Sequence, residues 1–317
     1  MKKQVVRLAG LAAGLALVAG LVAGCGGSGG TRADDAGADG TSGAQATVYP
    51  VTITDDAGRA VTIAARPERI VSLTPGNTEI VCALGGIDRL VGVTTQCDYP
   101  AEVTEITEIG DFASPNLEAV AAVDPDVVFV TTGVQADVIA QLEALGASVI
   151  AVDPQTLDGL YASIATVGTV IDENESAADV VSSMRIQIED IGERVEGAPV
   201  TCFLEISQNP LYTVGAGTLL DELIQHAGGE NIVTEPGYVA YSVEQLLAAD
   251  PDVYLATAGS MSDPSDLVGR PGYSELSAVA NGRVYILDDN LVSRPGPRVA
   301  EGIRVIAEAL YPDAFAE

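Results

Sequence analysis

The segment ENESAADVVSSMRIQIEDIGERVE, residues 173–196, determines the architecture that the sequence predicts. Its apolar residues recur at alternating intervals of four and three positions, which is the spacing of one face of an α-helix. These residues are Ala177, Val181, Met184, Ile188, Ile191 and Val195. Asp172 with Glu175 indicates a capping-box start, and Gly197 followed by Pro199 indicates the end. At about 1.5 Å per residue the helix would span roughly 36 Å, about the width of a domain.

Two related segments lie on either side of the predicted helix. NLEAVAAVDPDVVFVTTG at residues 116–133 aligns without a gap with SVEQLLAADPDVYLATAG at residues 242–259. Glu118 corresponds to Glu244, so the offset is 126 residues, and eight of the 18 positions are identical. A generic helix, turn and strand could share the DPDV run, but this many identities favour an internal repeat. We therefore expect two similar lobes, one on each side of the helix.

Short apolar segments alternate with amphipathic segments along both predicted lobes. Before the long helix, the strands RIVSL, RLVGVT, DVVFVTT and ASVIAVD are separated by the helices TEIVCALGG, NLEAVAAV and ADVIAQLEALG. The same alternation runs from VTCFLEIS to the last helix, PRVAEGIRVIAEALYP, and residues 48–63 predict a β-hairpin. Apolar strands between such helices are typical of covered parallel sheets. The predicted fold class is α/β, with two similar lobes of mainly parallel sheets joined by a single long α-helix.

The composition excludes several classes of function. Fifteen basic residues against 45 acidic ones give a formal net charge of −30, which disfavours direct binding to a nucleic-acid backbone or an anionic membrane surface. The chain has no Trp and a single His, so it cannot build a metal site from several histidines. It also lacks a nucleophile elbow and a Ser/His/Asp set. We therefore expect a binding protein rather than an enzyme, with no catalytic residue, no metal site and no cofactor.

The histidine and the cysteines leave alternatives open. His226 lies near the end of a predicted helix, where the helix dipole favours it, and a role as a metal or corrin ligand is the alternative. No two cysteines have a C-x-x-C spacing. In an exported protein, Cys82 and Cys97 could form a disulfide, which would leave Cys202 as a thiol.

The first residues predict export and lipid attachment. Residues 1–24 carry three basic residues and then an apolar run ending in small residues, which is typical of a secretory signal peptide. The run VAGC, which ends at Cys25, resembles the lipobox of bacterial lipoproteins, and an ordinary signal peptide that happens to contain a Cys is the alternative. The Gly- and Ser-rich stretch that follows predicts a flexible tether. The predicted division is a signal peptide (1–24), lipidated Cys25 with the tether (25–46), an N-terminal α/β lobe (47–171), a connecting helix (172–197) and a C-terminal α/β lobe (198–317).

The predicted strands end in segments that suit ligand binding. Ligands of open α/β sheets bind outside the carboxyl ends of the strands. Those ends carry amide, aromatic, carboxylate and arginine side chains, in segments 74–77, 95–99, 111–112, 209–212 and 289–294 and at Thr132, Asp153 and Tyr238. Two such edges that face each other would form a cleft.

Six runs of the sequence occur in one order across residues 69–312. They are RIVSLTPGNTEIVCALGG, LVGVTTQCDYP, IGDFASPNLEAVAAVDPDVVFV, NPLYTVGAGTLLDELIQHAGGENIV, YSVEQLLAADPDVYLA and AVANGRVYILDDNLVSRPGPR. Together they resemble the cobalamin and iron-chelate class of ABC-importer substrate-binding proteins. The resemblance implies two lobes on a rigid helical backbone and a lipoprotein held by its anchor on the extracytoplasmic face of the cell membrane. It also implies an ABC permease and its ATPase as partners, and we expect a monomer.

The resemblance also implies roles for individual residues. In the runs NLE and SVEQ it implies that Glu118 and Glu244 dock the two lobes onto the permease, and a helix-dipole role alone is the alternative. The positions that it implies for ligand contact in the cleft are Gln96, Phe112, Tyr212, Tyr238, Asn290 and Arg294.

The ligand that the resemblance implies is a corrinoid, cobalamin. CDYP and SRPGPR most resemble cobalamin binders, although siderophore and haem binders use related runs, so a ferric siderophore or haem is the alternative. The chain departs from the cobalamin pattern by its lack of Trp and by Gln96, where an aromatic residue is often found. A secreted enzyme or a ligand sensor on the same fold is a further alternative.

Overall fold

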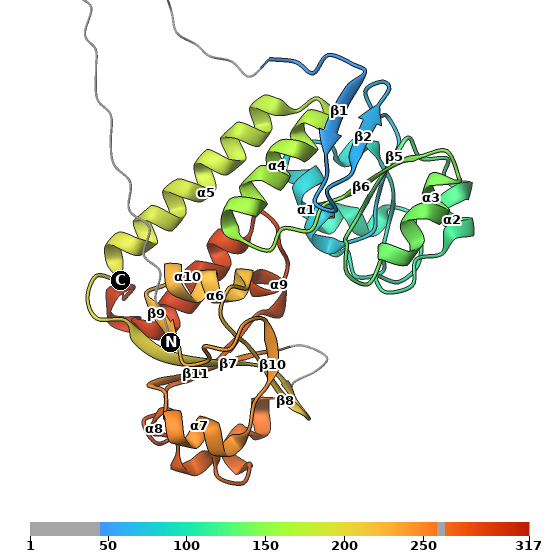
Figure 1. The fold of residues 1–317 in the computed structure, drawn as a ribbon. Coiled ribbons are helices and arrows are strands. Elements are labelled where there is room, and N and C mark those ends of the chain that lie inside the picture. Colours follow the sequence, from blue (N-terminus) through green and yellow to red (C-terminus); the bar gives the residue numbers. More distant parts are fainter. Residues whose placement is uncertain (1–44, 259–263, 317) are drawn as a thin grey trace, which may run out of the picture. The chain divides into compact units, whose positions relative to one another are not determined.

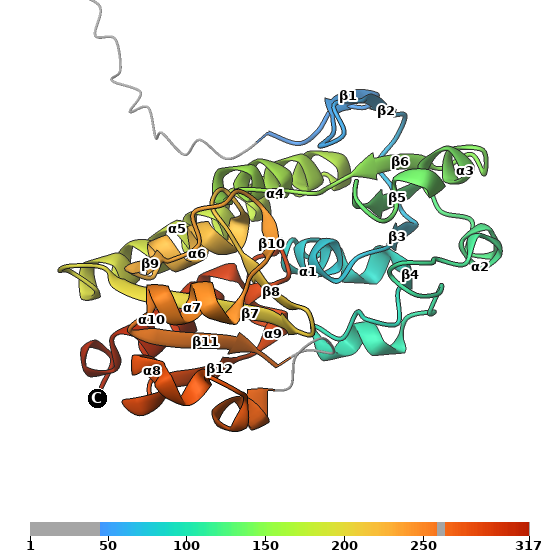
Figure 2. The same ribbon diagram turned by 60° about the horizontal axis from the view of Figure 1, so that its bottom comes forward.

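The computed structural model describes residues 45–258 and 264–316. The predicted signal peptide, the predicted lipidation site Cys25, nearly all of the tether and Gly259 of the second repeat lie outside these residues. All described residues belong to one compact unit of the chain, Gly43–Glu317. Figures 1 and 2 show their helices and strands in two orientations.

The first sheet has four strands in the order β4-β3-β5-β6, and all neighbours are parallel. The strands are β3 (Ile70–Ser72), β4 (Leu90–Val93), β5 (Val127–Val130) and β6 (Ser148–Ala151). Successive residues of the strands pack alternately into two apolar clusters, one on each face. Helix α1 (Pro75–Ala83) contributes to one cluster, and α2 (Leu117–Ala122) and α3 (Ile139–Glu143) contribute to the other. This burial on both faces explains why the strands are continuous apolar runs in the sequence.

The second sheet has six strands in the order β10-β8-β7-β11-β12, with β9 paired to β7. The strands are β7 (Val200–Gln208), β8 (Leu211–Val214), β9 (Gly229–Asn231), β10 (Tyr238–Ala240), β11 (Val253–Thr257) and β12 (Val284–Leu287). Its helices are α6 (Leu219–His226), α7 (Val243–Ala249), α8 (Ser277–Ala280), α9 (Asp289–Val292) and α10 (Val299–Leu310). Short 3-10 helices, η1 (Ile87–Arg89), η2 (Ala101–Glu105), η3 (Ala136–Val138), η4 (Pro264–Gly269), η5 (Tyr273–Glu275) and η6 (Pro312–Ala314), complete the described elements.

The second sheet corrects one expectation. Strands β7, β9, β11 and β12 form parallel pairs, but β8 is antiparallel to β7 and β10 is antiparallel to β8. The sequence predicted Tyr212 and Tyr238 at carboxyl ends of strands, which is wrong, because they lie in β8 and β10. For Tyr212 the reason is the two-residue connection Asn209-Pro210, which folds β8 directly back onto β7, and Tyr238 lies in a strand, β10, that pairs with β8.

Two helices connect the sheets. Helix α4 (Leu157–Ile171) and helix α5 (Asn174–Arg194) lie between β6 and β7 in the chain. Helix α5 is the long helix that the sequence predicts, and on the predicted face it buries Ala177, Met184, Ile188 and Ile191.

The predicted capping box at the start of α5 is wrong. Asp172 has a left-handed backbone with φ of 58° and ends α4, so it is not the N-cap of α5. Its carboxylate accepts a hydrogen bond from the Thr47 N–H at 2.6 Å. The N-cap of α5 is Glu173, which makes no side-chain capping bond.

One apolar cluster contains residues of both sheets. It includes Val127 and Phe129 of the first sheet, Leu204 and Leu255 of the second, and buried residues of α4, α5, α6 and α10. Separating the lobes would expose this cluster, and buried apolar surface stabilises a fold by about 25 cal/mol per Å². The role of α5 as the single rigid link, and the domain limits given above, remain proposals.

The internal repeat has the same geometry in both sheets. In each DPDV run the first aspartate has a positive φ at the end of a helix: Asp124, with φ of 44°, follows the C-cap of α2, and Asp250, with φ of 42°, is the C-cap of α7. The second aspartate accepts a hydrogen bond from a backbone N–H at the start of a neighbouring parallel strand: Asp126 at β3, at 2.9 Å, and Asp252 at β7, at 3.3 Å. The repeated residues therefore form the same helix, turn and strand in both lobes.

The predicted hairpin is present and is fastened to the first sheet. Strands β1 (Val51–Thr54) and β2 (Ala60–Ile63) pair antiparallel. The carboxylate of Asp55, a residue only 5% exposed, accepts hydrogen bonds from the N–H groups of Arg59, at 2.8 Å, and Ala151, at 3.1 Å. Burial alone would raise the pKa of Asp55, but these bonds and the Arg59 guanidinium outweigh it, so the pKa lies below its usual value.

We expect Asp55→Asn to lower the free energy of unfolding by about 1–3 kcal/mol at neutral pH, because buried N–H groups lose a charged acceptor. A lowered pKa means that the carboxylate stabilises the fold above the usual Asp pKa of about 3.9, and that this stability is lost as the pH falls through the folded-state pKa. The difference in the free energy of unfolding between wild type and variant, measured by chemical denaturation, should therefore shrink as the pH falls from about 5 to about 2. A difference that stays constant over this range would contradict the assignment, and Asp88→Asn, at an exposed position, is the control.

Candidate functional site

Segments that follow parallel strands of the two sheets contact each other. Arg294 lies just beyond β12 and α9, and its guanidinium forms an ion pair with Asp98, in the segment that follows β4. It also donates to the backbone oxygen of Gln96 at 3.2 Å and to the Glu79 carboxylate at 3.3 Å. Because these bonds connect a segment after β12 with a segment after β4, the two carboxyl edges face each other here, as the sequence predicts for a ligand site.

A buried carboxylate lies at the centre of this junction. Glu79 of α1 is 3% exposed, and it accepts hydrogen bonds from Arg298 Nε at 2.9 Å and from Arg298 Nη2 at 2.6 Å. These bonds raise the pKa of Arg298, and its guanidinium carbon also lies 4.0 Å from the centre of the Tyr99 ring. The hydrogen bond from Arg294 holds the pKa of Asp98 below its usual value. The junction is thus a network of two arginines and two carboxylates from both lobes.

Glycines allow the two lobes to approach at this junction. A Cβ atom on Gly76, in the first turn of α1, would lie 2.7 Å from the backbone oxygen of Pro295. Gly296 in turn faces the Gly76 backbone oxygen and Glu79. The runs PGN at 75–77 and PGP at 295–297 are therefore one place where the backbones of the two lobes come close, and a larger residue at position 76 would push them apart.

Four of the predicted ligand residues lie in or next to this junction: Gln96, Phe112, Arg294 and, in the helix before Arg294, Asn290. Gln96 accepts a hydrogen bond from the Phe112 N–H at 2.9 Å through its side chain and one from Arg294 through its backbone. Its side-chain amide donates to Asp111 at 2.6 Å. Asn290 is a half-buried residue of α9, one helical turn before Arg294.

The sequence did not indicate Gln135, which organises the same edge. Gln135 is fully buried, and its amide donates to the backbone oxygens of Leu73 and Phe112, both at 2.8 Å. Its side-chain oxygen accepts from the Thr131 N–H at 3.0 Å. One amide therefore connects the segments after β3 and β5 with the Phe112 segment. A glutamine in a predicted loop has no spacing signal, so only the fold identifies it.

The two predicted tyrosines form a second group. In the antiparallel pair of β8 and β10, Tyr212 is opposite Ala240 and Tyr238 is opposite Val214. The tyrosines are therefore diagonal neighbours on one face of the sheet. They are 37% and 54% exposed, so their rings present an aromatic surface to solvent.

The predicted docking carboxylates occupy equivalent places in the two lobes. Glu118 and Glu244 are both exposed, and each is the second residue of a helix, α2 or α7. Asn116 and Ser242 are the N-caps of these helices and accept hydrogen bonds from backbone N–H groups of the first turn.

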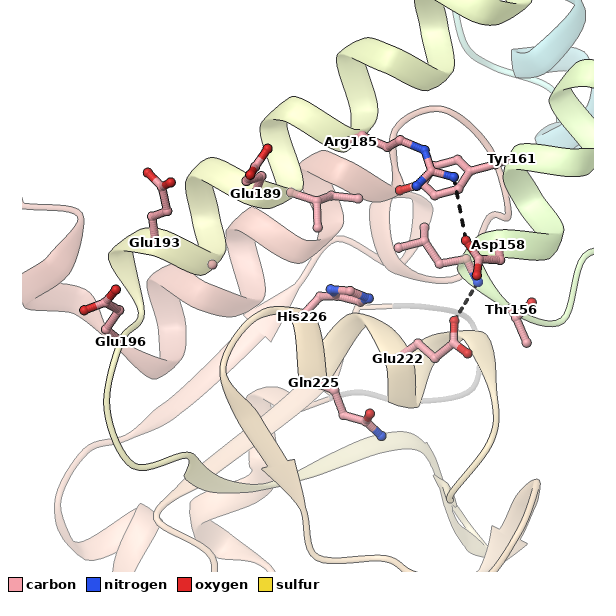
Figure 3. A pocket seen from close by; sticks show the side chains of 13 residues that line it. Thr156, Asp158, Tyr161, Arg185, Glu189, Glu193, Glu196, Glu222, Gln225 and His226 are labelled. Atoms are coloured by element: carbon pink, nitrogen blue, oxygen red, sulfur yellow. Dashed lines mark hydrogen bonds and ion pairs between the residues drawn. The ribbon is translucent and has the colours of Figure 1, made fainter. Parts of the chain in front are cut away.

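Figure 3 shows a groove of about 1000 Å³ that lies elsewhere, between α4, α5 and α6. Its lining is rich in carboxylates, and Glu222 of α6 accepts a hydrogen bond from the Leu157 N–H, at the start of α4, at 2.6 Å. His226 is the last residue of α6 and lines the same groove, so it lies at the helix end where the sequence places it. None of the six predicted ligand residues lines this groove.

Three further observations bear on the chemistry of the described residues. Cys82, Cys97 and Cys202 are free thiols, so the structure contains no Cys82–Cys97 disulfide. Among residues 45–258 and 264–316, no group of three or more His, Cys, Asp or Glu is placed to hold a metal ion. No helix in this part of the chain has the length and apolar character that are needed to cross a bilayer.

Comparison with known proteins gives consistent matches. A family model described as periplasmic binding protein matches residues 70–291. The chain is 37% identical over 280 residues to YvrC of Bacillus subtilis, an uncharacterized ABC transporter substrate-binding lipoprotein, which covers 85% of this chain and 88% of YvrC. It is 29% identical over 282 residues to a cobalamin-binding protein of Halobacterium salinarum, covering 83% of this chain and 74% of that protein. The solved structure of a periplasmic heme binding protein from Pseudomonas aeruginosa is 27% identical with a TM-score of 0.71, covering 78% of this chain and 93% of that one.

Proposed function

Because the chain belongs to the periplasmic binding protein family, we propose that it captures a corrinoid between its lobes and delivers it to the permease of an ABC importer. It is a substrate-binding component of an ABC transporter and not an enzyme, and this role implies a permease as partner. The corrinoid is the part that we propose. It is supported most directly by the similarity to a relative named a cobalamin-binding protein, which extends over 83% of the chain.

The chemistry of the junction also supports a corrinoid. A corrin ring has broad, partly apolar faces and a rim of amides, so it needs aromatic contacts and neutral hydrogen-bonding groups. Tyr212 and Tyr238 offer two exposed rings on one face of the second sheet, and Phe112 offers a half-buried ring in the first lobe. Gln96, Asn290 and the Arg294 network provide hydrogen-bonding groups near the lobe junction.

The distribution of positive charge argues against a strongly anionic ligand. The chain has no lysine after Lys3. Every arginine of the described residues donates a hydrogen bond to a carboxylate or a backbone oxygen, or, in the case of Arg185, forms an ion pair with a carboxylate. Haem propionates and ferric catecholates are usually held by free guanidinium or ammonium groups. A ligand of that kind would have to displace an existing partner.

Haem or a ferric siderophore is the alternative. A structural neighbour is named a heme binding protein, and the exposed phenol of Tyr212 could serve as an axial ligand to haem iron. The paired state of the arginines makes this alternative the weaker one.

The place of the protein in the cell is also a proposal. Its relative in Bacillus subtilis is a lipoprotein, and the VAGC run of this chain would allow the same attachment through Cys25. We propose a monomer held by this anchor on the extracytoplasmic face of the cell membrane. Mass spectrometry of the N-terminal peptide would test the attachment.

We expect cyanocobalamin to bind with a sub-micromolar dissociation constant in a fluorescence or calorimetric titration. Tyr212→Ala should weaken binding about tenfold or more, because an aromatic contact is lost. Tyr212→Phe keeps the ring and is the matched control, which should remain within about threefold of wild type. Undetectable cobalamin binding, together with tight binding of haem or a ferric siderophore, would contradict the corrinoid proposal and support haem or a siderophore as the ligand.

A further inference from the structure

The charge of Arg294 is already neutralised in the structure. Both of its terminal nitrogens face Asp98: Nη1 contacts Oδ1, and Nη2 lies 3.3 Å from Oδ2. Glu79 and the Gln96 backbone oxygen take further hydrogen bonds from the same group. The guanidinium is therefore surrounded by acceptors that the protein itself supplies.

The two carboxylates that hold Arg294 differ in their exposure. The side chain of Glu79 is 2% exposed and is also held by Arg298, so it is fixed within the lobe junction. The side chain of Asp98 is 52% exposed and belongs to the segment after β4. Asp98 is therefore the carboxylate that a ligand at this junction would meet.

We infer that Asp98 is a specificity-determining residue, which selects amide-bearing ligands against ligands that bear carboxylates. The Asp98 carboxylate has lone pairs beyond those that Arg294 occupies, so a primary amide of a ligand can donate a hydrogen bond to it. A carboxylate can only accept hydrogen bonds, and Asp98 would repel its charge. This inference rests on the proposed function, because it assumes that the ligand binds at the lobe junction.

The test compares two probes that differ in one functional group. These are cyanocobalamin and the monocarboxylic acid obtained by hydrolysing one of its side-chain amides. Wild type should prefer the amide form by about tenfold or more. In Asp98→Asn this preference should fall by about tenfold, because the repulsion is gone and Arg294 can pair with the ligand carboxylate. Asp88→Asn removes an equal charge at an exposed position before β4 and should keep the wild-type preference.

Two additional variants make the result decisive. Asp98→Ser removes the charge in a different way, so it answers the same question if the asparagine variant unfolds, which a thermal melt would reveal. In the double variant Asp98→Asn with Arg294→Gln, the increased relative affinity for the monocarboxylic acid should disappear, because the cation that would bind the ligand carboxylate is absent. An unchanged preference in Asp98→Asn, or an equal change in Asp88→Asn, would overturn the inference.

A third probe separates this inference from the proposed function. Hemin carries two propionates, so Asp98→Asn should bind it about tenfold more tightly than wild type does. If neither corrinoid binds wild type, but hemin binds Asp98→Asn about tenfold more tightly than wild type, the proposed ligand is wrong and the role of Asp98 stands. If cyanocobalamin binds wild type well, and neither the monocarboxylic acid nor hemin binds Asp98→Asn more tightly than wild type, the proposed function stands and the role of Asp98 is wrong.

Discussion

Replacing Glu118 and Glu244 together by alanine should abolish transport while the affinity for the ligand stays nearly unchanged. Both carboxylates are exposed, and they occupy equivalent positions in α2 and α7. Each substitution would remove a charge pair with the permease, and such a loss at a desolvated contact costs roughly 2–5 kcal/mol. Uptake of labelled ligand by cells should therefore fall by at least about a hundredfold.

The helix dipole is the competing explanation for these two glutamates, and a matched control tests it. Glu175 and Glu301 are also exposed acidic residues in the first turns of helices, α5 and α10. Replacing both by alanine removes the same charge and the same dipole interaction, which is worth about 0.3–1 kcal/mol each. This control should transport normally. If it fails to transport, or if the variant lacking Glu118 and Glu244 transports normally, these two glutamates are not the docking residues.

The sequence predicted those parts of the fold that depend on local patterns. Alternating apolar spacing located α5, and the repeated DPDV run located equivalent turns, because each signal lies within a few residues of the structure it describes. Strands β8 and β10 were missed because they are short and lie among Gly and Pro residues, and their antiparallel pairing depends on partners elsewhere in the chain. Asp172 was misassigned because a short polar turn between two helices resembles both an end and a start.

The candidate site was harder to predict than the fold. Arg294 could be selected because it lies in the segment 289–294 that follows a predicted strand, but its partner Glu79 is 215 residues away in the sequence. One signal for Glu79 was present. It is the only charged residue in the predicted helix TEIVCALGG, and a charge in an otherwise apolar helix needs a partner when it is buried. The identity of that partner required the fold.

We expect Glu79→Gln to lower the free energy of unfolding by roughly 3–5 kcal/mol, the usual result when one partner of a buried charge network is removed. Glu79 is 3% exposed and accepts hydrogen bonds from both Arg294 and Arg298, so the variant removes the carboxylate that Arg298 pairs with and leaves Arg294 paired with Asp98. Chemical denaturation would measure the change. Hydrogen exchange should rise in α1, which carries Glu79, and in α10, whose N-cap is Arg298.

The matched control is Glu143→Gln, which breaks an ion pair with Arg59 at a carboxylate that is 51% exposed. An exposed pair contributes at most about 1 kcal/mol, so this variant should be close to wild type. If Glu79→Gln is equally mild, the apolar cluster shared by α4, α5, α6 and α10 is sufficient to hold the lobes together. If it is severe, as we expect, the lobes are held in addition by charges at the place where the ligand is proposed to bind. The residues that set the relative position of the lobes would then be direct neighbours of those that select the ligand.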